Sequence, residues 1–322
     1  MPYSIKYGIN DNTIDITDIC IKNHMQSNII YIPADDNIRA KLFTDPIWGI
    51  VKSIYVYNGS ILIDIFNDTL NIYIDMQLEK VYINNIPEYI QNIFPNLKTT
   101  IRLAEIHSKL TLKYGTFIDE LPEQLMAVRY LKGDEKVLEI GGNIGRNSLI
   151  IASILNEHNN SNFVSLECDE KTSKLLICNR DINSLKFNIE SSALSTRKLI
   201  QTIPKYSVIN ETMASEVLLD GYRPVNIISY NDLKAKYGIE FDTLVLDCEG
   251  AFYYILLDMP EILDNINTII MENDYKDILH KEYIDKVLKS SNFTCVYTEA
   301  GGWGCCYNNF FEVWKRSNVS KA

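Results

Sequence analysis

The sequence has no concentration of basic residues. Its 31 lysines and arginines are scattered among 42 acidic residues, and the formal net charge is −11. Binding a nucleic-acid backbone needs a basic stripe that displaces counterions, so we expect no nucleic-acid partner. No stretch approaches ~20 consecutive apolar residues, and the first residues, MPYSIKYGINDN, lack a hydrophobic signal region. We therefore expect a cytoplasmic protein with no membrane partner.

The cysteine pattern lacks the CxxC spacing that surrounds a metal ion. Of the 7 cysteines, Cys305 and Cys306 are adjacent, and the others stand alone, mostly inside apolar runs. Such spacing favours reduced, buried thiols over a zinc site. We predict no metal.

The chain is long enough for two compact units. It has 322 residues, of which 46% are hydrophobic and 23% charged, an ordinary composition for a folded protein. Residues 1–77 predict a β-rich domain, because short β-branched and aromatic runs alternate with turn residues. Its clearest element is a hairpin of strands 52–57 and 60–66 around Asn58 and Gly59, the pair suited to a type I′ turn. Residues 78–116 predict a helical connector.

The remaining segment, residues 117–318, alternates between strand and helix patterns. DELPEQLMAVRYLKG has helix start and stop signals, and VLEIG, NFVSLE, NIESSALS, FDTLVLD and NTIIMEN read as strands with helices between them. FTCVYTEAGGWG and NFFEVWK predict a final antiparallel pair. This alternation predicts an α/β domain whose mostly parallel, seven-stranded sheet is covered by helices on both faces.

The strand VLEI ends in a glycine-rich loop. Gly141, Gly142 and Gly145 remove side chains that would keep another molecule away from the backbone. Ligands of open parallel sheets lie outside the carboxyl ends of the strands. Glu167 ends the next strand about 20 residues later, the separation expected of a carboxylate that accepts hydrogen bonds from ribose. The pattern therefore indicates a cofactor that contains adenosine.

The spacing of this loop decides between cofactors. A dinucleotide fingerprint would have glycines where Asn143 and Arg146 stand, and no Gly-Lys-Ser/Thr follows as in a P-loop. The pattern E-x-G-x-N-x-G leaves room for a ligand without forming a pyrophosphate cradle. S-adenosylmethionine has adenosine and no phosphate, so it is favoured over NAD.

Five stretches, in order, resemble one enzyme family. EIGGNIGRNS, LECDE, SSALS, LDCEGAFYYIL and IIMENDY resemble the FkbM family of S-adenosylmethionine-dependent methyltransferases over roughly residues 114–315, and LDCEGAFYYIL and GGWG most resemble versions carried by giant DNA viruses. The resemblance implies a Rossmann-like class I methyltransferase fold, S-adenosyl-L-methionine as cofactor and S-adenosyl-L-homocysteine as product. FkbM-type enzymes are mostly O-methyltransferases, which implies a sugar, glycan or nucleotide-sugar acceptor. If the protein is viral, we expect it to be located in the host cytoplasm.

The resemblance also implies a cofactor-binding set. It places the glycine-rich loop beneath the methionine part of the cofactor with Glu139 close by, Glu167 at the ribose, and Ser192 and Ala193 against the adenine. Cys168 stands where many relatives have proline. The whole implied set is Glu139, Gly141, Gly142, Asn143, Gly145, Asn147, Glu167, Cys168, Ser192, Ala193 and Asp247.

Acidic residues at later strand ends are the candidates for catalysis. Methyl transfer is an in-line displacement, and a carboxylate within hydrogen-bond reach can accept the proton of the acceptor. Asp247, ending FDTLVLD, is the first choice for this base and Glu249 the second. Glu272, Asp274 and Trp303 are candidate acceptor-binding residues, Trp303 by stacking against a sugar face.

Several alternatives stay open. Glu249 and Glu272 also fit as caps of the helices that follow them, and His280 is a weaker base candidate. Glu123 and Gln124 fit helix capping better than cofactor contact. At the level of function, the alternatives are N-methylation of an amino sugar or peptide amine, a non-catalytic protein that binds a glycan or another protein, and, more remotely, a nicotinamide-dependent oxidoreductase.

The role of the β-rich domain is not indicated by its sequence. YGINDNTIDIT and FTDPIWGIVKSIYV resemble a small β-domain that precedes some giant-virus enzymes. Contacts to the acceptor, formation of a homodimer and docking onto a larger glycan assembly are all compatible with it.

Overall fold

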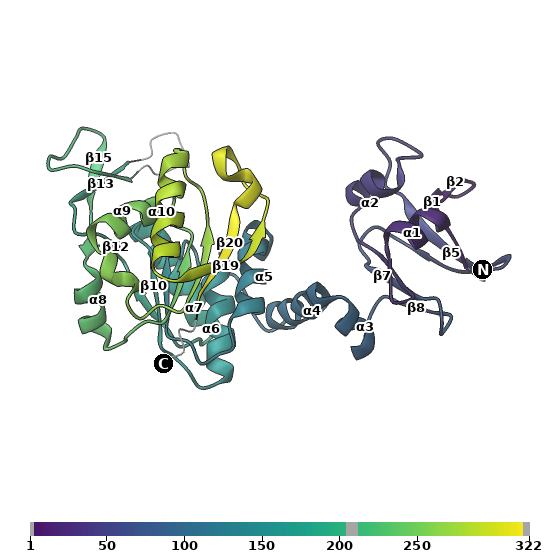
Figure 1. The fold of residues 1–322 in the computed structure, drawn as a ribbon, viewed down its shortest axis with the longest axis horizontal. Coiled ribbons are helices and arrows are strands. Elements are labelled where there is room, and N and C mark those ends of the chain that lie inside the picture. Colours follow the sequence, from purple (N-terminus) through teal and green to yellow (C-terminus); the bar gives the residue numbers. More distant parts are fainter. Residues whose placement is uncertain (1–2, 204–211, 318–322) are drawn as a thin grey trace. The chain divides into compact units, whose positions relative to one another are not determined.

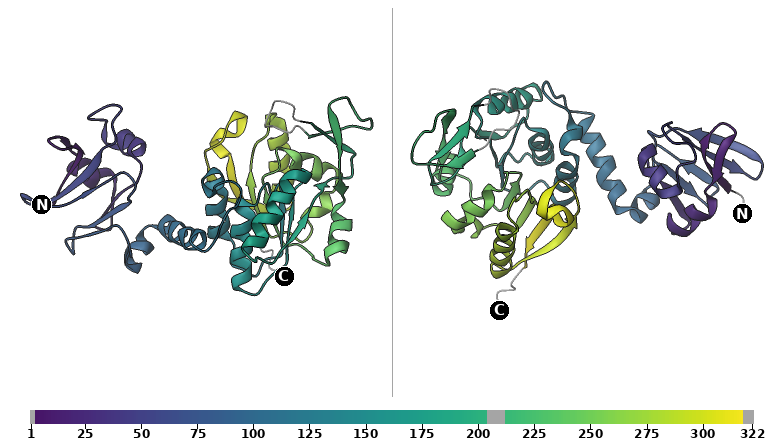
Figure 2. Two further views of the ribbon diagram at one scale, coloured as in Figure 1. Left: turned by 180° about the vertical axis from the view of Figure 1, so that it is seen from behind. Right: turned by 90° about the horizontal axis from the view of Figure 1, so that it is seen from above.

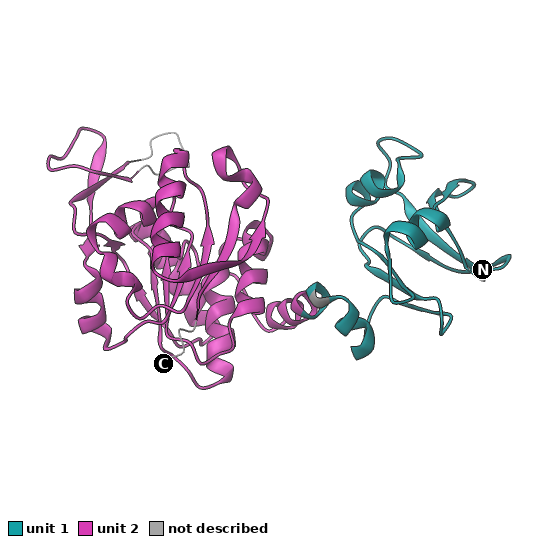
Figure 3. Ribbon diagram, in the orientation of Figure 1, with its two compact units in different colours: residues 1–98 teal, residues 99–322 magenta. Residues whose placement is uncertain are grey.

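The computed structural model describes residues 3–203 and 212–317 and divides into two compact units, residues 1–98 and 99–322 (Figure 3). The predicted connector, residues 78–116, spans this division. It holds helix α3 (Glu88–Ile93) and helix α4 (Pro95–His107), and the division falls inside α4.

The first unit is built from two antiparallel four-stranded sheets (Figure 1). An apolar core that includes Ile5, Ile30, Val56 and Ile74 joins them, so the β-rich character predicted for this part of the chain is confirmed. One sheet has the order β2-β1-β5-β6 and the other β3-β4-β7-β8. The elements are β1 (Tyr3–Ile9), β2 (Asn12–Asp15), α1 (Thr17–Asn23), β3 (Met25–Gln26), β4 (Ile29–Ile32), α2 (Asp36–Phe43), β5 (Ser53–Asn58), β6 (Ile61–Phe66), β7 (Ile72–Asp75) and β8 (Lys80–Tyr82).

The predicted hairpin is present as β5 and β6, but its turn lies one residue later than predicted. Asn58 is the last residue of β5 and pairs with Ile61, so Gly59 and Ser60 form the turn. Gly59 has a φ of 59°. Glycine at the first central position is the arrangement of a type II′ turn, which needs a positive φ only there.

The second unit contains one seven-stranded sheet with the order β11-β10-β9-β17-β18-β20-β19. The first five strands in this order run parallel, whereas β20 is antiparallel to both β18 and β19. This mixed, mostly parallel sheet confirms the predicted architecture and is the one that the methyltransferase resemblance implies. The strands are β9 (Val137–Ile140), β10 (Phe163–Leu166), β11 (Asn188–Glu190), β17 (Thr243–Leu246), β18 (Thr268–Glu272), β19 (Phe293–Glu299) and β20 (Phe311–Arg316).

Helices cover both faces of this sheet (Figures 1 and 2). Successive strand residues point to opposite faces: Leu138 and Leu246 join a core with α8, α9 and α10, while Val137 and Val245 join a core with α4 to α7. Both faces are apolar, as expected for the central strands of a parallel sheet. The remaining helices are η1 (Phe117–Glu120), α5 (Leu121–Tyr130), α6 (Arg146–Glu157), α7 (Glu170–Ile182), α8 (Tyr230–Tyr237), α9 (Ala251–Asp258), η2 (Pro260–Leu263), α10 (Ile278–Ser290) and η3 (Gly304–Asn309).

The segment NIESSALS is not one strand, as predicted, but two. β11 ends at Glu190, and β12 (Ala193–Leu194) pairs with β16 (Ile227–Ile228) outside the main sheet. Between the two strands, Ser192 Oγ donates a hydrogen bond to Glu190 Oε1 at 2.9 Å. The sequence analysis also missed a three-stranded antiparallel sheet of β13 (Leu199–Thr202), β14 (Thr212–Ala214) and β15 (Tyr222–Val225).

Candidate active site

The chain order of the main sheet reverses between β9 and β17. From β9 the chain continues to β10 and β11 on one side, and later returns to β17 and β18 on the other. In open α/β sheets, ligands bind at the carboxyl ends of the strands beside such a reversal. The Asp247 amide donates to the Ile140 carbonyl at 3.1 Å, and the Gly141 amide donates to the Leu166 carbonyl at 3.0 Å. The ends of β9, β10 and β17 are thus linked at one edge, which we call the carboxyl edge.

The glycines of the loop after β9 are required by packing within the protein. A Cβ atom at Gly141 would lie 1.6 Å from the carbonyl oxygen of Asp247, and one at Gly142 would lie 2.1 Å from Ser165 Oγ. A Cβ atom at Gly145 would lie 2.4 Å from a methyl carbon of Leu176. The glycines are therefore needed for contacts within the protein, in addition to any room that they leave for a ligand. Gly141 lets the ends of β9 and β17 approach each other.

The same loop fixes Glu167, the last acid of the β10 segment. The Asn143 amide donates to Glu167 Oε2 at 3.0 Å, and the Asp169 amide donates to Oε1 at 2.7 Å. Asn143 reaches this position with a φ of 46°, in the left-handed region that asparagine tolerates. Burial raises the pKa of Glu167 to about 7 against these two hydrogen bonds. The carboxyl group is therefore held in one orientation beside the glycine loop.

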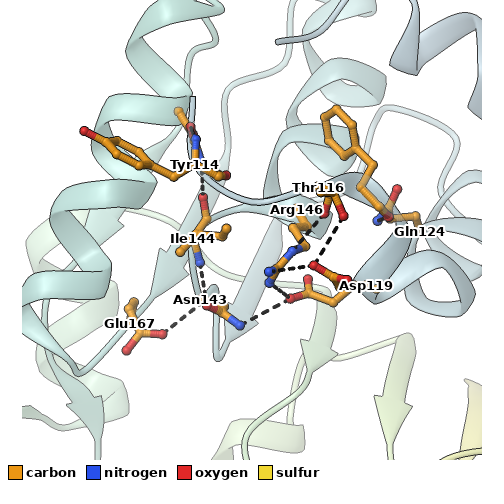
Figure 4. Close-up of polar contacts among 11 residues, drawn as sticks. Tyr114, Thr116, Asp119, Gln124, Asn143, Ile144, Arg146 and Glu167 are labelled. Carbon is orange, nitrogen blue, oxygen red and sulfur yellow. Dashed lines mark hydrogen bonds and ion pairs between the residues drawn. The ribbon is translucent and has the colours of Figure 1, made fainter. Parts of the chain in front are cut away.

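Arg146 joins the loop to the segment before α5 (Figure 4). Its guanidinium donates to Glu120 Oε1 at 2.8 Å, to Asp119 Oδ2 at 3.0 Å and to the Thr116 carbonyl at 2.9 Å. The Asn143 side-chain amide donates to the same Glu120 oxygen at 3.3 Å. The sequence analysis missed this connection. The available signal was an arginine at the position where a dinucleotide motif would have its third glycine.

Glu139 lies inside the domain rather than at the loop surface. Its side chain is 2% exposed, and Oε2 accepts hydrogen bonds from the hydroxyls of Ser148 and Ser165. Burial raises the pKa of Glu139 to about 7. Glu139 therefore links β9 to α6 and β10.

The residues expected on the adenine side lie in two segments, one after β10 and one after β11. Cys168, next to Glu167, is half-buried, and burial raises the pKa of its thiol to about 11. Ser192 is buried, and its hydroxyl is engaged by Glu190, while Ala193 is half-buried in β12. These positions follow β10 and β11, so they border the carboxyl edge on the side away from β17.

Carboxyl groups converge on the other side of the carboxyl edge. Burial raises the pKa of Asp247 well above its ordinary range, and four neighbouring carboxyl groups raise it further. Burial and the charge of Asp247 likewise raise the pKa of Glu272, which is hydrogen-bonded to Glu123, to about 10. Like charges in a buried place disfavour ionisation of one another. The four neighbours of Asp247 are Glu120, Glu123, Asp274 and Glu249.

Glu249 and Asp274 form a second hydrogen-bonded pair. Burial and the charge of Glu249 raise the pKa of Asp274 to about 7, and the Gly250 amide donates to Asp274 Oδ1 at 2.8 Å. Neither Glu249 nor Glu272 caps a helix through a side-chain hydrogen bond. The N-cap residue of α9 is Gly250, which has no side-chain cap, and the cap of α10 is Asp277.

Three further residues singled out in the sequence are Trp303, His280 and Gln124. Trp303, 54% exposed, directly precedes η3. His280 stacks on Tyr253 with 3.8 Å between ring centroids, which ties α10 to α9. Gln124 is fully buried; its side-chain amide donates to the Phe117 carbonyl at 2.7 Å, so it holds η1 rather than a ligand.

The described residues contain neither a metal-binding group nor a membrane-spanning helix. Among residues 3–203 and 212–317, no group of three or more His, Cys, Asp or Glu side chains is arranged to hold a metal ion. Within those ranges, every helix is too short or too polar to cross a lipid bilayer. Within the described residues, the second unit has a hollow of about 260 Å³ beside β13 and β15, and the first unit has one of about 700 Å³ between β6 and β8.

No protein-family model matches the chain, and no curated protein matches it. Among solved structures, the chain is similar to the O-methyltransferase from Bacillus cereus in complex with SAH, at 12% identity and a TM-score of 0.38, covering 71% of this chain and 96% of that one. It is similar to a cofactor-bound protein from MTB at 12% identity and a TM-score of 0.37, covering 70% and 94%. A protein from Clostridium thermocellum assigned as an rRNA-methylase has 10% identity and a TM-score of 0.39, covering 64% and 99%. At such identities, function has to be argued from the residues of this chain.

Proposed function

We propose that the protein is an S-adenosylmethionine-dependent methyltransferase of the FkbM type that methylates a hydroxyl oxygen of a sugar, glycan or nucleotide-sugar. The observation that carries the proposal is the geometry of the carboxyl edge. Glu167 is held by the amide of Asn143 from the glycine loop, and Asp247 lies against Gly141 at the reversal of strand order. In this proposal the carboxyl group of Glu167 holds the ribose, and that of Asp247 lies beside the transferred methyl group.

The charge of the carboxyl edge fits a cationic methyl donor. S-adenosylmethionine has a sulfonium and an ammonium group and no phosphate, whereas a dinucleotide would bring an anionic pyrophosphate next to Asp247, Glu272 and Asp274. Carboxyl groups that raise one another's pKa are stabilised in their ionised form by a nearby cation. A net charge of −11 also opposes a nucleic-acid acceptor. The residues present therefore suit this cofactor.

Asp247 is the proposed general base. When bound, the cofactor would supply a methyl group on sulfur. Asp247 accepts the proton of the acceptor hydroxyl as the bond from oxygen to carbon forms and the bond from carbon to sulfur breaks. Its raised pKa makes it a stronger base than an ordinary aspartate once it is ionised. Glu249, hydrogen-bonded to Asp274, is the second candidate.

The acceptor side is proposed to be formed by Glu272, Asp274 and the exposed indole of Trp303. Carboxyl oxygens accept hydrogen bonds from hydroxyl groups, and an aromatic face packs on a sugar ring. The same acidity favours one second candidate, methylation of an amine, because an ammonium group would be attracted to these residues. The atom that carries the methyl group in the isolated product distinguishes the two.

Calorimetric titration with S-adenosylhomocysteine tests the proposal. Wild-type protein should bind it; Glu167→Ala should lose most of this affinity because the ribose partner is gone. Glu170→Ala is the matched control, since Glu170 is an exposed acid on α7 that pairs with Lys174. In the same series Asp247→Asn should keep binding and lose roughly 10²- to 10⁴-fold in methyl transfer from labelled cofactor.

The contrary outcomes have different meanings. Folded wild-type protein that does not bind S-adenosylhomocysteine would remove the catalytic proposal and favour a binding protein that retains the fold. Full activity in Asp247→Asn would leave the function in place and move the base to another residue, with Glu249→Gln as the next variant.

A further inference from the structure

Glu123 of α5 is a buried acid with one unpaired oxygen. Its side chain is 8% exposed, and Oε2 has no hydrogen-bond partner. Asn147, in the first turn of α6, is 6% exposed, and its Oδ1 is likewise without a partner. Both atoms accept hydrogen bonds, and both residues interact with Glu120: the Asn147 amide donates to it, and Glu123 adds charge to it. Unpaired buried acceptors are costly, which indicates a donor that the protein itself does not supply.

The carboxyl group of Glu123 is oriented by Glu272. A hydrogen bond between two carboxyl groups needs one proton, so one partner is neutral. The pKa of Glu272, raised to about 10 first by burial, identifies Glu272 as the neutral partner. The same hydrogen bond lowers the pKa of Glu123 against the larger effect of burial. Glu123 is therefore the acceptor of this bond.

We propose that Glu123 binds the α-ammonium group of the methyl donor through Oε2, with Asn147 Oδ1 as a second acceptor and neutral Glu272 as the residue that positions Glu123. The inference rests on the proposed function and extends it to the amino-acid end of the cofactor. An ammonium group has three N–H donors, which match acceptors that lack a partner. Glu120 does not compete for the ammonium, because it already accepts from Arg146 and Asn143.

This assignment gives Glu272 a role in addition to the acceptor contact expected from the sequence. A neutral carboxylic acid that donates to Glu123 is a positioning residue for Glu123. The two glutamates are joined by one hydrogen bond but have opposite protonation states. The same substitution, Glu to Gln, should therefore affect them unequally, because glutamine mimics a neutral acid as a donor and cannot replace a charged acceptor.

The experiment compares two ligands that share the adenosine and the thioether. S-adenosylhomocysteine has the α-ammonium group, whereas 5′-methylthioadenosine lacks the amino-acid end. Calorimetry with wild-type protein should give a clear preference for S-adenosylhomocysteine. Glu123→Gln should weaken its binding roughly ten- to a hundredfold, as for one charge-assisted hydrogen bond, and leave 5′-methylthioadenosine binding unchanged. Glu272→Gln should stay within about twofold of wild type for both ligands, since its side-chain amide donates to Glu123 in place of the proton.

Binding of 5′-methylthioadenosine reports the fold of each variant and the adenosine part of the site. If Glu123→Gln keeps the wild-type preference for S-adenosylhomocysteine, or if both variants lose it equally, the inference is overturned while the proposed function stands. If wild-type protein binds neither ligand, the proposed function fails, and the inference fails with it.

Discussion

The two units bury charge in opposite ways. In residues 1–98, Arg39 is fully buried and donates to three backbone carbonyls, those of Pro33, Asn67 and Leu70, at 2.6–2.8 Å. At the carboxyl edge of the second unit, buried acids meet other acids, and their pKa values rise. A buried charge with complete partners holds a fold together, whereas an uncompensated group of like charges destabilises it. Such groups are typical of functional sites.

The contrast between compensated and uncompensated buried charges also distinguishes two sites within the second unit. The second unit also contains a compensated buried pair, Lys281 and Glu312, with 2.9 Å between Nζ and Oε2. Trp314 Nε1 donates to the same Glu312 oxygen at 2.8 Å. Glu312 is thus a buried carboxyl group paired with a cation. At the carboxyl edge, Asp247 and Glu272 instead lie close to other acids.

Removing a compensated charge should have the largest effect on stability. Arg39→Met would leave three buried carbonyl oxygens without donors, at about 1–3 kcal/mol for each group that stays unsatisfied. We expect the free energy of unfolding of the first unit to fall by about 3 kcal/mol or more, measured by urea unfolding. Lys41→Met is a change at an exposed residue of the same helix. Its free energy of unfolding should differ from that of wild type by no more than about 0.5 kcal/mol. Equal stability of the two variants would contradict the contrast between compensated and uncompensated charges.

Raising the pH should weaken the second unit because burial raises the pKa of two of its acids. Glu139 and Glu167 have folded-state pKa values of about 7, above the ordinary 4.5 of a glutamate. Between these values the native state holds protons that the unfolded chain releases, so stability falls as pH rises from about 5 to about 7. The expected slope is on the order of 1 kcal/mol per pH unit for each group. Urea unfolding at several pH values measures it.

Glu139→Gln should reduce that slope, because the buried group no longer titrates. Glu282→Gln, a change at an exposed acid of α10, is the control and should keep the wild-type slope. A wild-type stability that is flat or rises over this pH range would show that the acids are compensated after all.

How far the sequence predicted the structure depends on the range of the interactions. Apolar residues such as Val137, Leu138 and Ile140 predicted a buried strand, and the alternation of strands with helices predicted the seven-stranded sheet. Acids at the ends of parallel strands could be assigned to one edge, because parallel strands end on the same side. These inferences use local pattern and general topology.

The parts that the sequence did not predict depend on tertiary contacts. Glu123 is on α5 and Glu272 is the last residue of β18, and only the packing of that helix on the sheet brings the two carboxyl groups together. The clash at Gly141 with the Asp247 carbonyl is equally invisible in the sequence, so the glycine was explained by a ligand instead of by a neighbouring strand. The short, polar strands β13 to β15 have too little apolar pattern to be recognised.

The smallest expected effect concerns glycines with a positive φ, which differ between the units in how closely other atoms surround them. Gly59 and Gly141 both have positive φ, at 59° and 96°, but a Cβ atom at Gly59 meets no described atom within 4 Å. Gly59→Ala should therefore cost only the backbone strain of the left-handed region, about 1–2 kcal/mol, measured as the loss of unfolding free energy in the first unit. Gly59→Asn should recover much of that loss, because asparagine tolerates this conformation. If asparagine and alanine cost the same, the turn is limited by space and not by φ, and the hairpin would then resemble the crowded loop at Gly141.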